Sequence, residues 1–230
     1  MPGRRESKNS ESVDNYLKAI LTLGGPEERR VTITSLAGHL TVAPASVTNM
    51  LQKLSESAEP LVEYERHRGV TLSALGRRRA LEVVRHHRLI ETFLYEVLDY
   101  PIEEVHDEAE RLEHFISERF EERIAAKLGH PKIDPHGHAI PTMEGEMALR
   151  ESMSLAEVEH DGTYLIDSIS DRDSARLRLI EACGIAPGVE LHVTRNPDLA
   201  LLDVHVGQSS ELHQIPVEVA QDVRIIRMAD

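Results

Sequence analysis

The sequence contains no tryptophan and a single cysteine, Cys183, in 230 residues. One cysteine excludes an internal disulfide framework and fits a reducing compartment. No stretch approaches the roughly 20 apolar residues that a membrane-spanning helix requires. The first residues, MPGRRESKNSES, are charged and no apolar segment follows them, so no signal peptide is expected. We therefore expect a cytoplasmic protein without a membrane partner.

Aromatic residues are also scarce, at 3% of the chain, whereas 40% of all residues are hydrophobic. A core of this composition is mainly aliphatic and favours helix-rich packing. The motifs HExxH, GxSxG, GxGxxG and the Walker A loop are all missing from the sequence. The most direct signs of a metalloprotease, a serine hydrolase or a nucleotide-binding enzyme are therefore absent.

The surplus of acidic residues is unevenly distributed. The formal net charge of −14 disfavours binding to nucleic acid, but residues 1–80 carry 12 Lys and Arg against 9 Asp and Glu. The remaining 150 residues carry 14 basic and 31 acidic side chains. This asymmetry allows a nucleic-acid-binding N-terminal part, although ordinary variation between domains would also produce it.

The N-terminal pattern predicts a winged helix-turn-helix. Helical periodicity over residues 11–23 is followed by two short helices, at 32–42 and 43–57, with only a few residues between them. Alternating apolar residues on both sides of RHRG, residues 66–69, indicate a hairpin. The order of these elements, rather than any one of them, is typical of the winged helix.

Helices are expected to continue beyond the hairpin. Residues 74–98 predict one long helix. A further helix is expected from Pro101 over residues 101–112 and beyond, so that it carries residues 105–114, and residues 115–128 continue helical. Three arginines, Arg77 to Arg79, begin the long helix; solvent exposure and contact with phosphate explain them equally well. After a polar stretch at 143–160, short strand-like runs predict a small β domain of the partly open barrel kind.

The stretch VHDEAERLEH, residues 105–114, contains two histidines and four carboxylates. If it is helical, four of these side chains point roughly the same way: His106, Glu110, Glu113 and His114. His87 and Glu91 are also four residues apart, on the preceding helix. If the two helices pack antiparallel, His87 and Glu91 meet His106, and two clusters of potential ligands form a few turns apart.

Imidazole and carboxylate groups are typical ligands of first-row divalent ions, and the lack of a nearby thiolate favours the harder Mn2+ or Fe2+. A single His–Glu pair on a helix is more often a surface ion pair. Two pairs on neighbouring helices, with an added Glu and His, favour a metal site. A dinuclear metal-dependent hydrolase fused to a winged helix would use similar ligands and remains the alternative.

Several of these segments resemble the diphtheria toxin repressor family of metal-dependent transcriptional regulators, especially its manganese-responsive branch. The segments are APASVTNMLQKL, YERHRGVTLSALGRRRA, RHHRLIETFL with EEVHDEAERLEH, and GHPKIDPHGHAIP. The resemblance implies a mainly α protein with an SH3-like, FeoA-type β-barrel at its C-terminus. The implied domains are residues 1–75 (winged helix), 76–142 (dimerisation and metal binding), 143–160 (linker) and 161–230 (FeoA-type).

The resemblance implies two metal sites per chain. The ancillary site would use His87, Glu91 and His106, completed by Asp173 as the nearest match or by Asp171 as its substitute. The family's next ligand position falls on Arg176, which cannot ligate. The primary site would use Glu110, Glu113 and His114. The first helix would complete it through Asn15, where relatives have Asp or Met, or through Asp14. A glutamate at position 110 is typical of the manganese-responsive branch.

The resemblance also implies contacts with double-stranded DNA. Ser46 and Asn49 would face base edges, with Ala45 against a thymine methyl group. The remaining expected contacts, to phosphates, are Thr48, Lys53, His67 and Arg68. We therefore expect a homodimeric repressor that binds a palindromic operator when Mn2+ or Fe2+ is present and controls metal-uptake genes. A regulator with purely structural metal sites is a further possibility.

Overall fold

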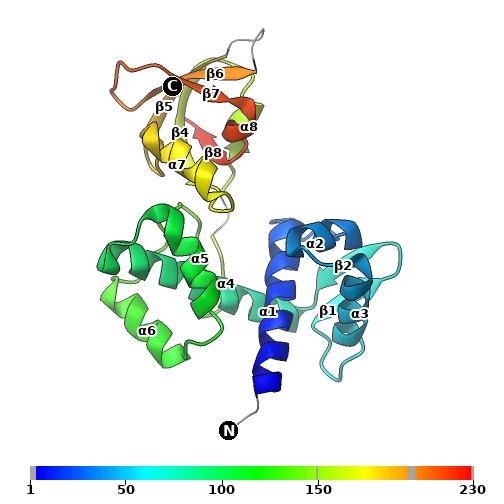
Figure 1. Ribbon diagram of the computed structural model, residues 1–230. Helices are drawn as coiled ribbons and strands as arrows, with labels where there is room; N and C mark the ends of the chain where they lie inside the picture. The colour runs from blue at the N-terminus through cyan, green and yellow to red at the C-terminus, as the bar shows by residue number, and fades with distance from the viewer. Residues whose placement is uncertain (1–3, 149, 196–199, 229–230) are drawn as a thin grey trace. The chain divides into compact units, whose positions relative to one another are not determined.

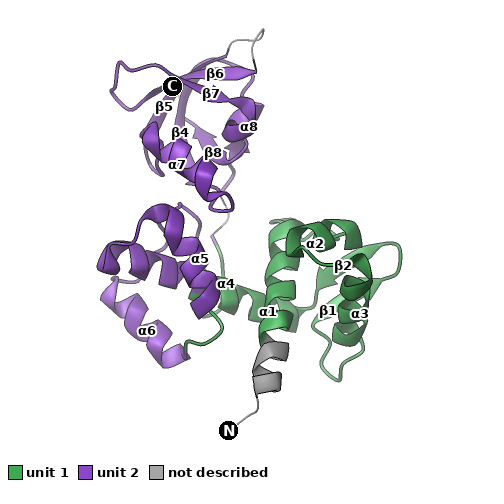
Figure 2. Cartoon of the chain, viewed as in Figure 1, with its two compact units in different colours: residues 1–86, 113–116, 141–147 green, residues 87–112, 117–140, 148–230 purple. Residues whose placement is uncertain are grey.

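The computed structural model describes residues 4–148, 150–195 and 200–228, with side chains from Glu11 onward within these ranges. The chain forms two compact units (Figure 2). The first contains residues 1–86, 113–116 and 141–147, and the second contains residues 87–112, 117–140 and 148–230.

The first unit contains the predicted winged helix-turn-helix (Figure 1). Its elements are α1 (Arg4–Gly24), α2 (Ile33–Leu40), α3 (Pro44–Ser55), β1 (Val62–Glu65), β2 (Gly69–Leu72) and the start of α4 (Ala74–Leu98). Thr32 caps α2 by accepting a hydrogen bond from the Ser35 amide, and Pro44 opens α3. One aliphatic core joins the three helices to the wing, and its fully buried members include Leu17, Leu36, Val47, Leu51 and Val70.

The wing is an antiparallel hairpin in which Val62 pairs with Leu72 and Glu65 pairs with Gly69. Gly69 has a φ of +96°, and a Cβ at this position would collide with the carbonyl oxygen of Val31. Only glycine satisfies both requirements, so the wing can lie against the strand-like residue Val31.

The second unit begins with the remainder of α4 and continues through α5 (Ile102–Leu112) and α6 (Glu118–Lys127). Leu89, Ile124, Ala125 and Ile140 form a small buried cluster between these helices and the loop that follows α6. Ser117 caps α6 by accepting a hydrogen bond from the Phe120 amide.

The predicted helix over residues 101–114 is wrong at its C-terminal end, because α5 stops at Leu112 and Glu113 to Phe115 form a turn. The carbonyl oxygen of Glu113 is contacted by His86 Nδ1 at 3.2 Å. The predicted helix at 115–128 likewise begins only at Glu118, after the Ser117 cap. His106 and Glu110 therefore lie on a helix, whereas Glu113 and His114 lie beyond its end.

The C-terminal part is a six-stranded antiparallel sheet in the order β3-β8-β4-β5-β6-β7. The strands are β3 (Met153–Ser154), β4 (Gly162–Ile169), β5 (Glu190–Arg195), β6 (Leu201–Val206), β7 (His213–Pro216) and β8 (Val223–Arg227). They are accompanied by the short helices η1 (Leu155–Glu157) and α8 (Val217–Ala220) and by α7 (Ser174–Ala182). Leu177 and Ile180 of α7 are buried in the core of the sheet.

One detail of this part differs from the sequence-based expectation, and another is left as a prediction. Residues 153–158 fall in the predicted linker, but β3 pairs with β8, and Leu155 and Val158 are buried in the core of the sheet. Within the described residues, β3 and β7 form the two ends of the sheet and do not pair, so barrel closure stays a prediction.

The loop after α6 is fixed against the sheet. The Ile169 amide donates a 2.9 Å hydrogen bond to the carbonyl oxygen of His136. Gly137 has a φ of +89°, and a Cβ there would collide with the carbonyl oxygen of Asp167. This close approach holds the loop residues beside β4.

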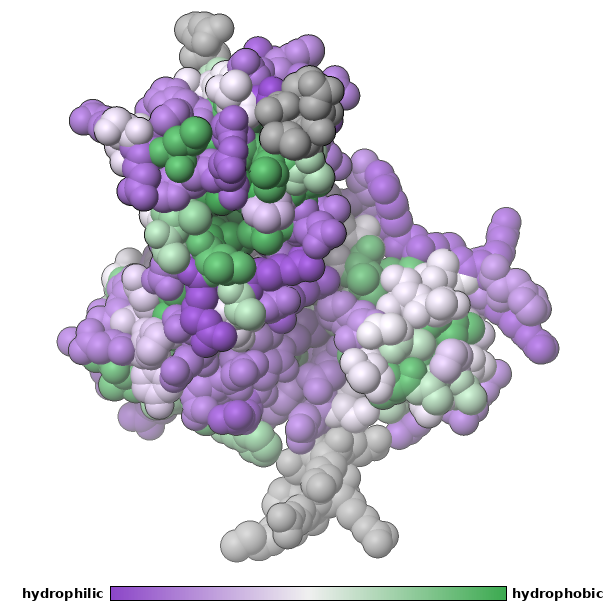
Figure 3. Space-filling view, turned by 45° about the horizontal axis from the view of Figure 1, so that its top comes forward, coloured by the Kyte–Doolittle hydropathy of each residue, from purple (hydrophilic) through white to green (hydrophobic). Residues whose placement is uncertain are grey.

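Hydrophilic residues predominate on the face seen in Figure 3, and apolar residues occur there in small patches. No helix in the described part of the chain has the length and apolar character needed to cross a membrane.

Candidate metal centres

Four side chains of the second unit converge on the ancillary site expected from the sequence. α4 contributes His87 and Glu91, α5 contributes His106, and the segment after β4 contributes Asp171. Glu91 Oε1 lies 2.9 Å from His87 Nε2 and 3.3 Å from His106 Nδ1, and His106 Nδ1 lies 3.2 Å from Asp171 Oδ2. One ligand atom from each residue lies within 4.8 Å of the others, which fits the nitrogen and oxygen donors of a divalent-ion site.

Opposite charges dominate the electrostatics of this cluster. Burial alone would raise the pKa of Glu91, but the charge of His87 and hydrogen bonds with His106 and His87 hold it well below its usual value. Burial would lower the pKa of His106, yet hydrogen bonds to Asp171 and Glu91 raise it to about 10. Without an ion, protonated imidazole therefore balances the carboxylates, and an ion that binds here must replace that proton.

The two aspartates that could complete the ancillary site have different surroundings, and the one that the resemblance favoured, Asp173, is not the one at the cluster. Asp171 contacts His106, whereas Asp173 Oδ1 caps α7 by accepting hydrogen bonds from the amides of Ala175 and Arg176 at 3.0 and 3.1 Å. The Arg176 guanidinium lies 3.1 Å from Asp222 Oδ2. The geometry therefore brings Asp171, and not Asp173, to the ancillary cluster.

The expected primary site has four of its residues in the first unit. Two oxygens converge on one nitrogen, because His114 Nε2 lies 2.9 Å from Asn15 Oδ1 and 3.3 Å from Glu113 Oε1. Glu113 is also paired with Lys18, whose Nζ donates to Oε1 and Oε2 at 2.8 and 2.9 Å. Sequence reasoning missed Lys18, because nothing in its local pattern indicates a partner 95 residues away.

Asp14 has a different main partner. Its Oδ1 accepts a 2.6 Å hydrogen bond from Arg79 Nε, while its Oδ2 lies 3.7 Å from His114 Nδ1. Burial would raise the pKa of Asp14, but hydrogen bonds with His114 and Arg79 lower it overall. Asn15 is thus the first-helix residue whose oxygen directly approaches His114. Glu110 lies on α5 in the second unit, and its part in the primary site stays a prediction.

A third group of potential ligands was not predicted. Asp134, His136 and His138 lie on the loop after α6, and one ligand atom of each lies within 4.8 Å of the others. The signal that would have found them is the alternation of Asp, His and His in DPHGH, which the sequence reading treated only as a loop motif.

Most of the expected DNA contacts are solvent-exposed. On α3, Ala45, Ser46, Asn49 and Lys53 are exposed, whereas Thr48 is partly buried and donates a hydrogen bond to the carbonyl oxygen of Pro44. His67 and Arg68 are exposed at the tip of the wing, where Arg68 lies 3.0 Å from Glu65 Oε2. Of these residues, Thr48 is the least available to a partner.

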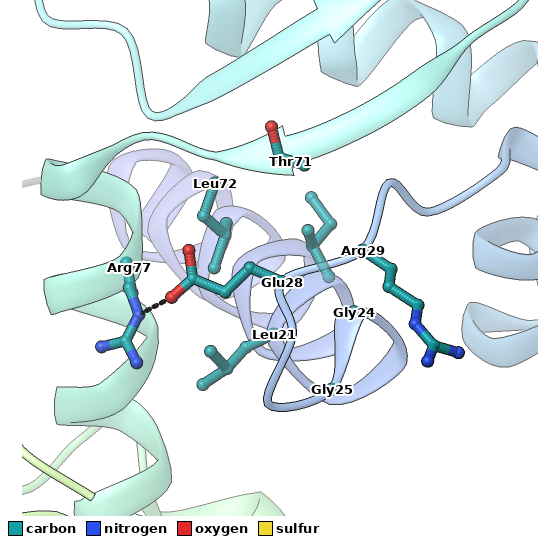
Figure 4. A pocket seen from close by; sticks show the side chains of 9 residues that line it. Leu21, Gly24, Gly25, Glu28, Arg29, Thr71, Leu72 and Arg77 are labelled. Carbon is teal, nitrogen blue, oxygen red and sulfur yellow. Dashed lines mark hydrogen bonds and ion pairs between the residues drawn. The ribbon is translucent and has the colours of Figure 1, made fainter.

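A pocket lies beside α1 and the wing (Figure 4), and none of the expected metal ligands lines it. Leu21, Gly24, Gly25, Thr71 and Leu72 line it, and Arg77 Nε pairs across it with Glu28 Oε1 at 2.5 Å. Arg77, one of the three arginines that begin α4, therefore has a carboxylate partner within its own unit.

Comparison with known families agrees with the described architecture. Residues 8–70 match the N-terminal DNA binding domain of the iron dependent repressor family, and residues 73–142 match its metal binding and dimerisation domain. Residues 153–227 match the FeoA domain. The chain belongs to the iron-dependent repressor family. The resemblance seen in the sequence is thereby confirmed, and the family's members are metal-dependent transcriptional repressors.

Individual relatives include both iron- and manganese-dependent repressors. The iron-dependent repressor IdeR of Mycobacterium leprae is 35% identical over 230 residues, covering 94% of this chain and 96% of the relative. IdeR of Mycobacterium tuberculosis is 35% identical over 133 residues, so the match spans 57% of this chain and about half, 56%, of that relative. A solved manganese-dependent transcriptional repressor in complex with manganese is 35% identical and has a TM-score of 0.85. The match covers 94% of this chain and 100% of the chain in that structure.

Proposed function

We propose that this chain is a cytoplasmic, homodimeric repressor that binds a palindromic operator when a divalent ion, Mn2+ in preference to Fe2+, occupies its primary site. Glu110, Glu113, His114 and Asn15 would hold that ion. The ancillary ion would be held by His87, Glu91, His106 and Asp171. Metal-uptake genes are the expected targets.

The observation that carries this proposal is the convergence of Asn15 Oδ1 and Glu113 Oε1 on His114 Nε2. Asn15 lies on α1, whose buried residues Tyr16 and Leu17 belong to the same core as α2 and α3. When bound, a divalent ion supplies the positive charge that draws an amide oxygen, carboxylates and an imidazole together. Ligation at Asn15 is thus coupled mechanically to the DNA-binding helices.

The same residues supply the selectivity of the response. Without an ion, the Lys18 ammonium pairs with both oxygens of Glu113, so an incoming ion competes with a built-in cation. An ion shifts the protein toward its DNA-binding arrangement only if it binds that arrangement more tightly than the other arrangements of the protein. The size of the shift equals this difference in affinity. The oxygen-rich primary set, with Glu110 in place of a thiolate, supports Mn2+ over softer ions.

The DNA-binding surface follows from α3 and the wing. Exposed Ser46 and Asn49 are proposed to face base edges, and exposed Ala45 is proposed to contact a thymine methyl group. Phosphates are proposed to be contacted by Thr48, Lys53, His67 and Arg68. We propose that the C-terminal sheet closes into an SH3-like barrel and contributes to regulation through Asp171.

Variants of the primary site test this proposal. Glu110→Ala and His114→Ala are expected to abolish the Mn2+-dependent gain in affinity for operator DNA, measured by fluorescence anisotropy. Asp107→Ala is the matched control, because Asp107 is an exposed carboxylate on the same helix, α5. Wild-type activation in both primary-site variants would remove this site from the mechanism. Equal DNA affinity with and without ions in the unaltered protein would indicate purely structural metal sites.

A further inference from the structure

One glutamate of the wing, Glu65, pairs with two arginines at once. Arg30 Nη2 lies 2.6 Å from Glu65 Oε1, and Arg68 Nη1 lies 3.0 Å from Glu65 Oε2. Arg30 Nη1 also donates a 3.4 Å hydrogen bond to the carbonyl oxygen of Gly69. Each oxygen of the Glu65 carboxylate therefore accepts from a different guanidinium group.

The backbone of the wing brings these three side chains together. Val31 and Val70 exchange two backbone hydrogen bonds, of 2.8 and 2.9 Å, so Arg30 lies directly beside the hairpin. Glu65 ends β1, and its carbonyl oxygen accepts a 3.0 Å hydrogen bond from the Arg68 amide, which closes the turn. The pairs thus follow from the fold of the first unit and are present without DNA.

Glu65 offers the two arginines the same kind of partner as a DNA phosphate does. Its hydrogen bond with Arg68 and the charge of Arg30 hold the pKa of the carboxyl below its usual value, so the group is ionised at neutral pH. Carboxylates and phosphates both accept charge-assisted N–H bonds from guanidinium groups. A guanidinium group that is paired with Glu65 therefore has fewer donors left for a phosphate.

The solvent exposure of the three side chains keeps these pairs weak. The side chain of Arg30 is 34% exposed, that of Glu65 45% and that of Arg68 76%. Ion pairs at such positions add little to the stability of a fold. The wing therefore does not depend on them, and a phosphate can displace the carboxylate at small cost.

We propose that Glu65 determines DNA specificity by competing with DNA phosphates for Arg30 and Arg68. Phosphates displace Glu65 where α3 already holds the duplex against the wing, and on other duplexes the two arginines stay paired with Glu65. Because phosphate contacts supply most of the affinity for non-specific DNA, Glu65 suppresses binding to duplexes without the operator. Arg30 thereby becomes a further phosphate-binding residue. The inference rests on the proposed function in one respect, namely that α3 and the wing face DNA.

Glu65→Gln in the full-length, Mn2+-loaded protein tests the proposal. Binding to the operator and to a random duplex is measured by fluorescence anisotropy between about 50 and 200 mM salt. We expect the affinity for the random duplex to rise about 5-fold, the effect of two exposed ion pairs. The slope of log affinity against log salt concentration should become steeper by at least about 0.9, the value for one additional phosphate. Operator affinity should rise less, so discrimination falls.

Glu63→Gln is the matched control for the loss of one negative charge. Glu63 is exposed, lies two residues before Glu65 on the same face of β1, and makes no ion pair in the part of the chain that the structure describes. Its replacement should leave the salt slope unchanged. In a background with Arg30→Ala and Arg68→Ala, Glu65→Gln should likewise have no effect, because the competing groups are gone.

The possible outcomes distinguish this inference from the proposed function. Equal changes in affinity and salt slope for Glu65→Gln and Glu63→Gln would overturn it, because Glu65 would then act only as one negative charge among others. Weaker binding of the random duplex by Glu65→Gln, with an unchanged urea midpoint of unfolding, would also overturn it, since Glu65 would then position the arginines for DNA. Operator binding that does not depend on metal, with the gain in Glu65→Gln retained, would support this inference and contradict the proposed function.

Discussion

Replacing Asp171 and Asp173 separately should produce two different losses. Asp171 Oδ2 lies 3.2 Å from His106 Nδ1 within the ancillary cluster, whereas Asp173 is exposed and accepts hydrogen bonds from two amides of α7. Asp171→Ala removes one of four clustered donors. Loss of even an outer partner of a metal ligand typically costs about 10–100-fold in metal affinity, so we expect at least about 10-fold, or roughly 1.4 kcal/mol.

Asp173→Ala should instead destabilise the fold without changing metal affinity. Loss of an N-cap costs about 1 kcal/mol in the free energy of unfolding. The assay is competition for Mn2+ with a chromogenic chelator in a His114→Ala background, combined with urea unfolding of each variant in EDTA. If Asp173→Ala weakens Mn2+ binding as strongly as Asp171→Ala does, or if Asp171→Ala leaves it unchanged, the assignment from geometry is refuted.

Three further predictions concern the primary site and the DNA surface. Asn15→Ala should weaken Mn2+-dependent DNA binding about 10-fold. Asp14→Ala should chiefly lower the urea midpoint of unfolding, because Asp14 is paired with Arg79. The reverse pattern would make Asp14 the ligand. Glu110→Cys should move the activation ranking toward softer ions such as Zn2+ and Cd2+, and an unchanged ranking in the same anisotropy assay would contradict the role of Glu110. Lys53→Ala should weaken binding to all duplexes and make the slope of log affinity against log salt concentration shallower by about one phosphate contact. Asn49→Ala should instead lose about 1–3 kcal/mol of discrimination at one base pair. Equal effects on specific and random duplexes in both variants would argue against these roles.

The N-terminal fold was readily predicted because its signals are local. The apolar stripe of α3, the proline at its start and the RHRG hairpin each act over a few residues, and the helix expected at 74–98 agrees with α4. Local periodicity also predicted the strand-rich C-terminal domain. It failed at β3, which is too short at two residues to produce a pattern.

The site was predictable only in part, because its geometry depends on contacts distant in sequence. Glu113 and His114 fit a helical pattern with His106, but the chain leaves the helix at Leu112, where His86 contacts the Glu113 carbonyl oxygen and Lys18 pairs with its side chain. The resemblance favoured Asp173 over Asp171, but Asp173 caps the start of α7, whereas Asp171 contacts His106.

If ion binding controls DNA binding, the affinity for the operator must change when the ion is added or removed. A palindromic operator is first selected from random duplexes in the presence of the full-length protein and Mn2+. Affinity of the apo-protein for this duplex is then measured by fluorescence anisotropy during titration with Mn2+ and, anaerobically, with Fe2+. We expect tight binding with Mn2+, binding with Fe2+ only at higher concentration, and release on addition of EDTA. Operator affinity that is the same in EDTA as in saturating Mn2+ and Fe2+ would contradict control of DNA binding by the ion.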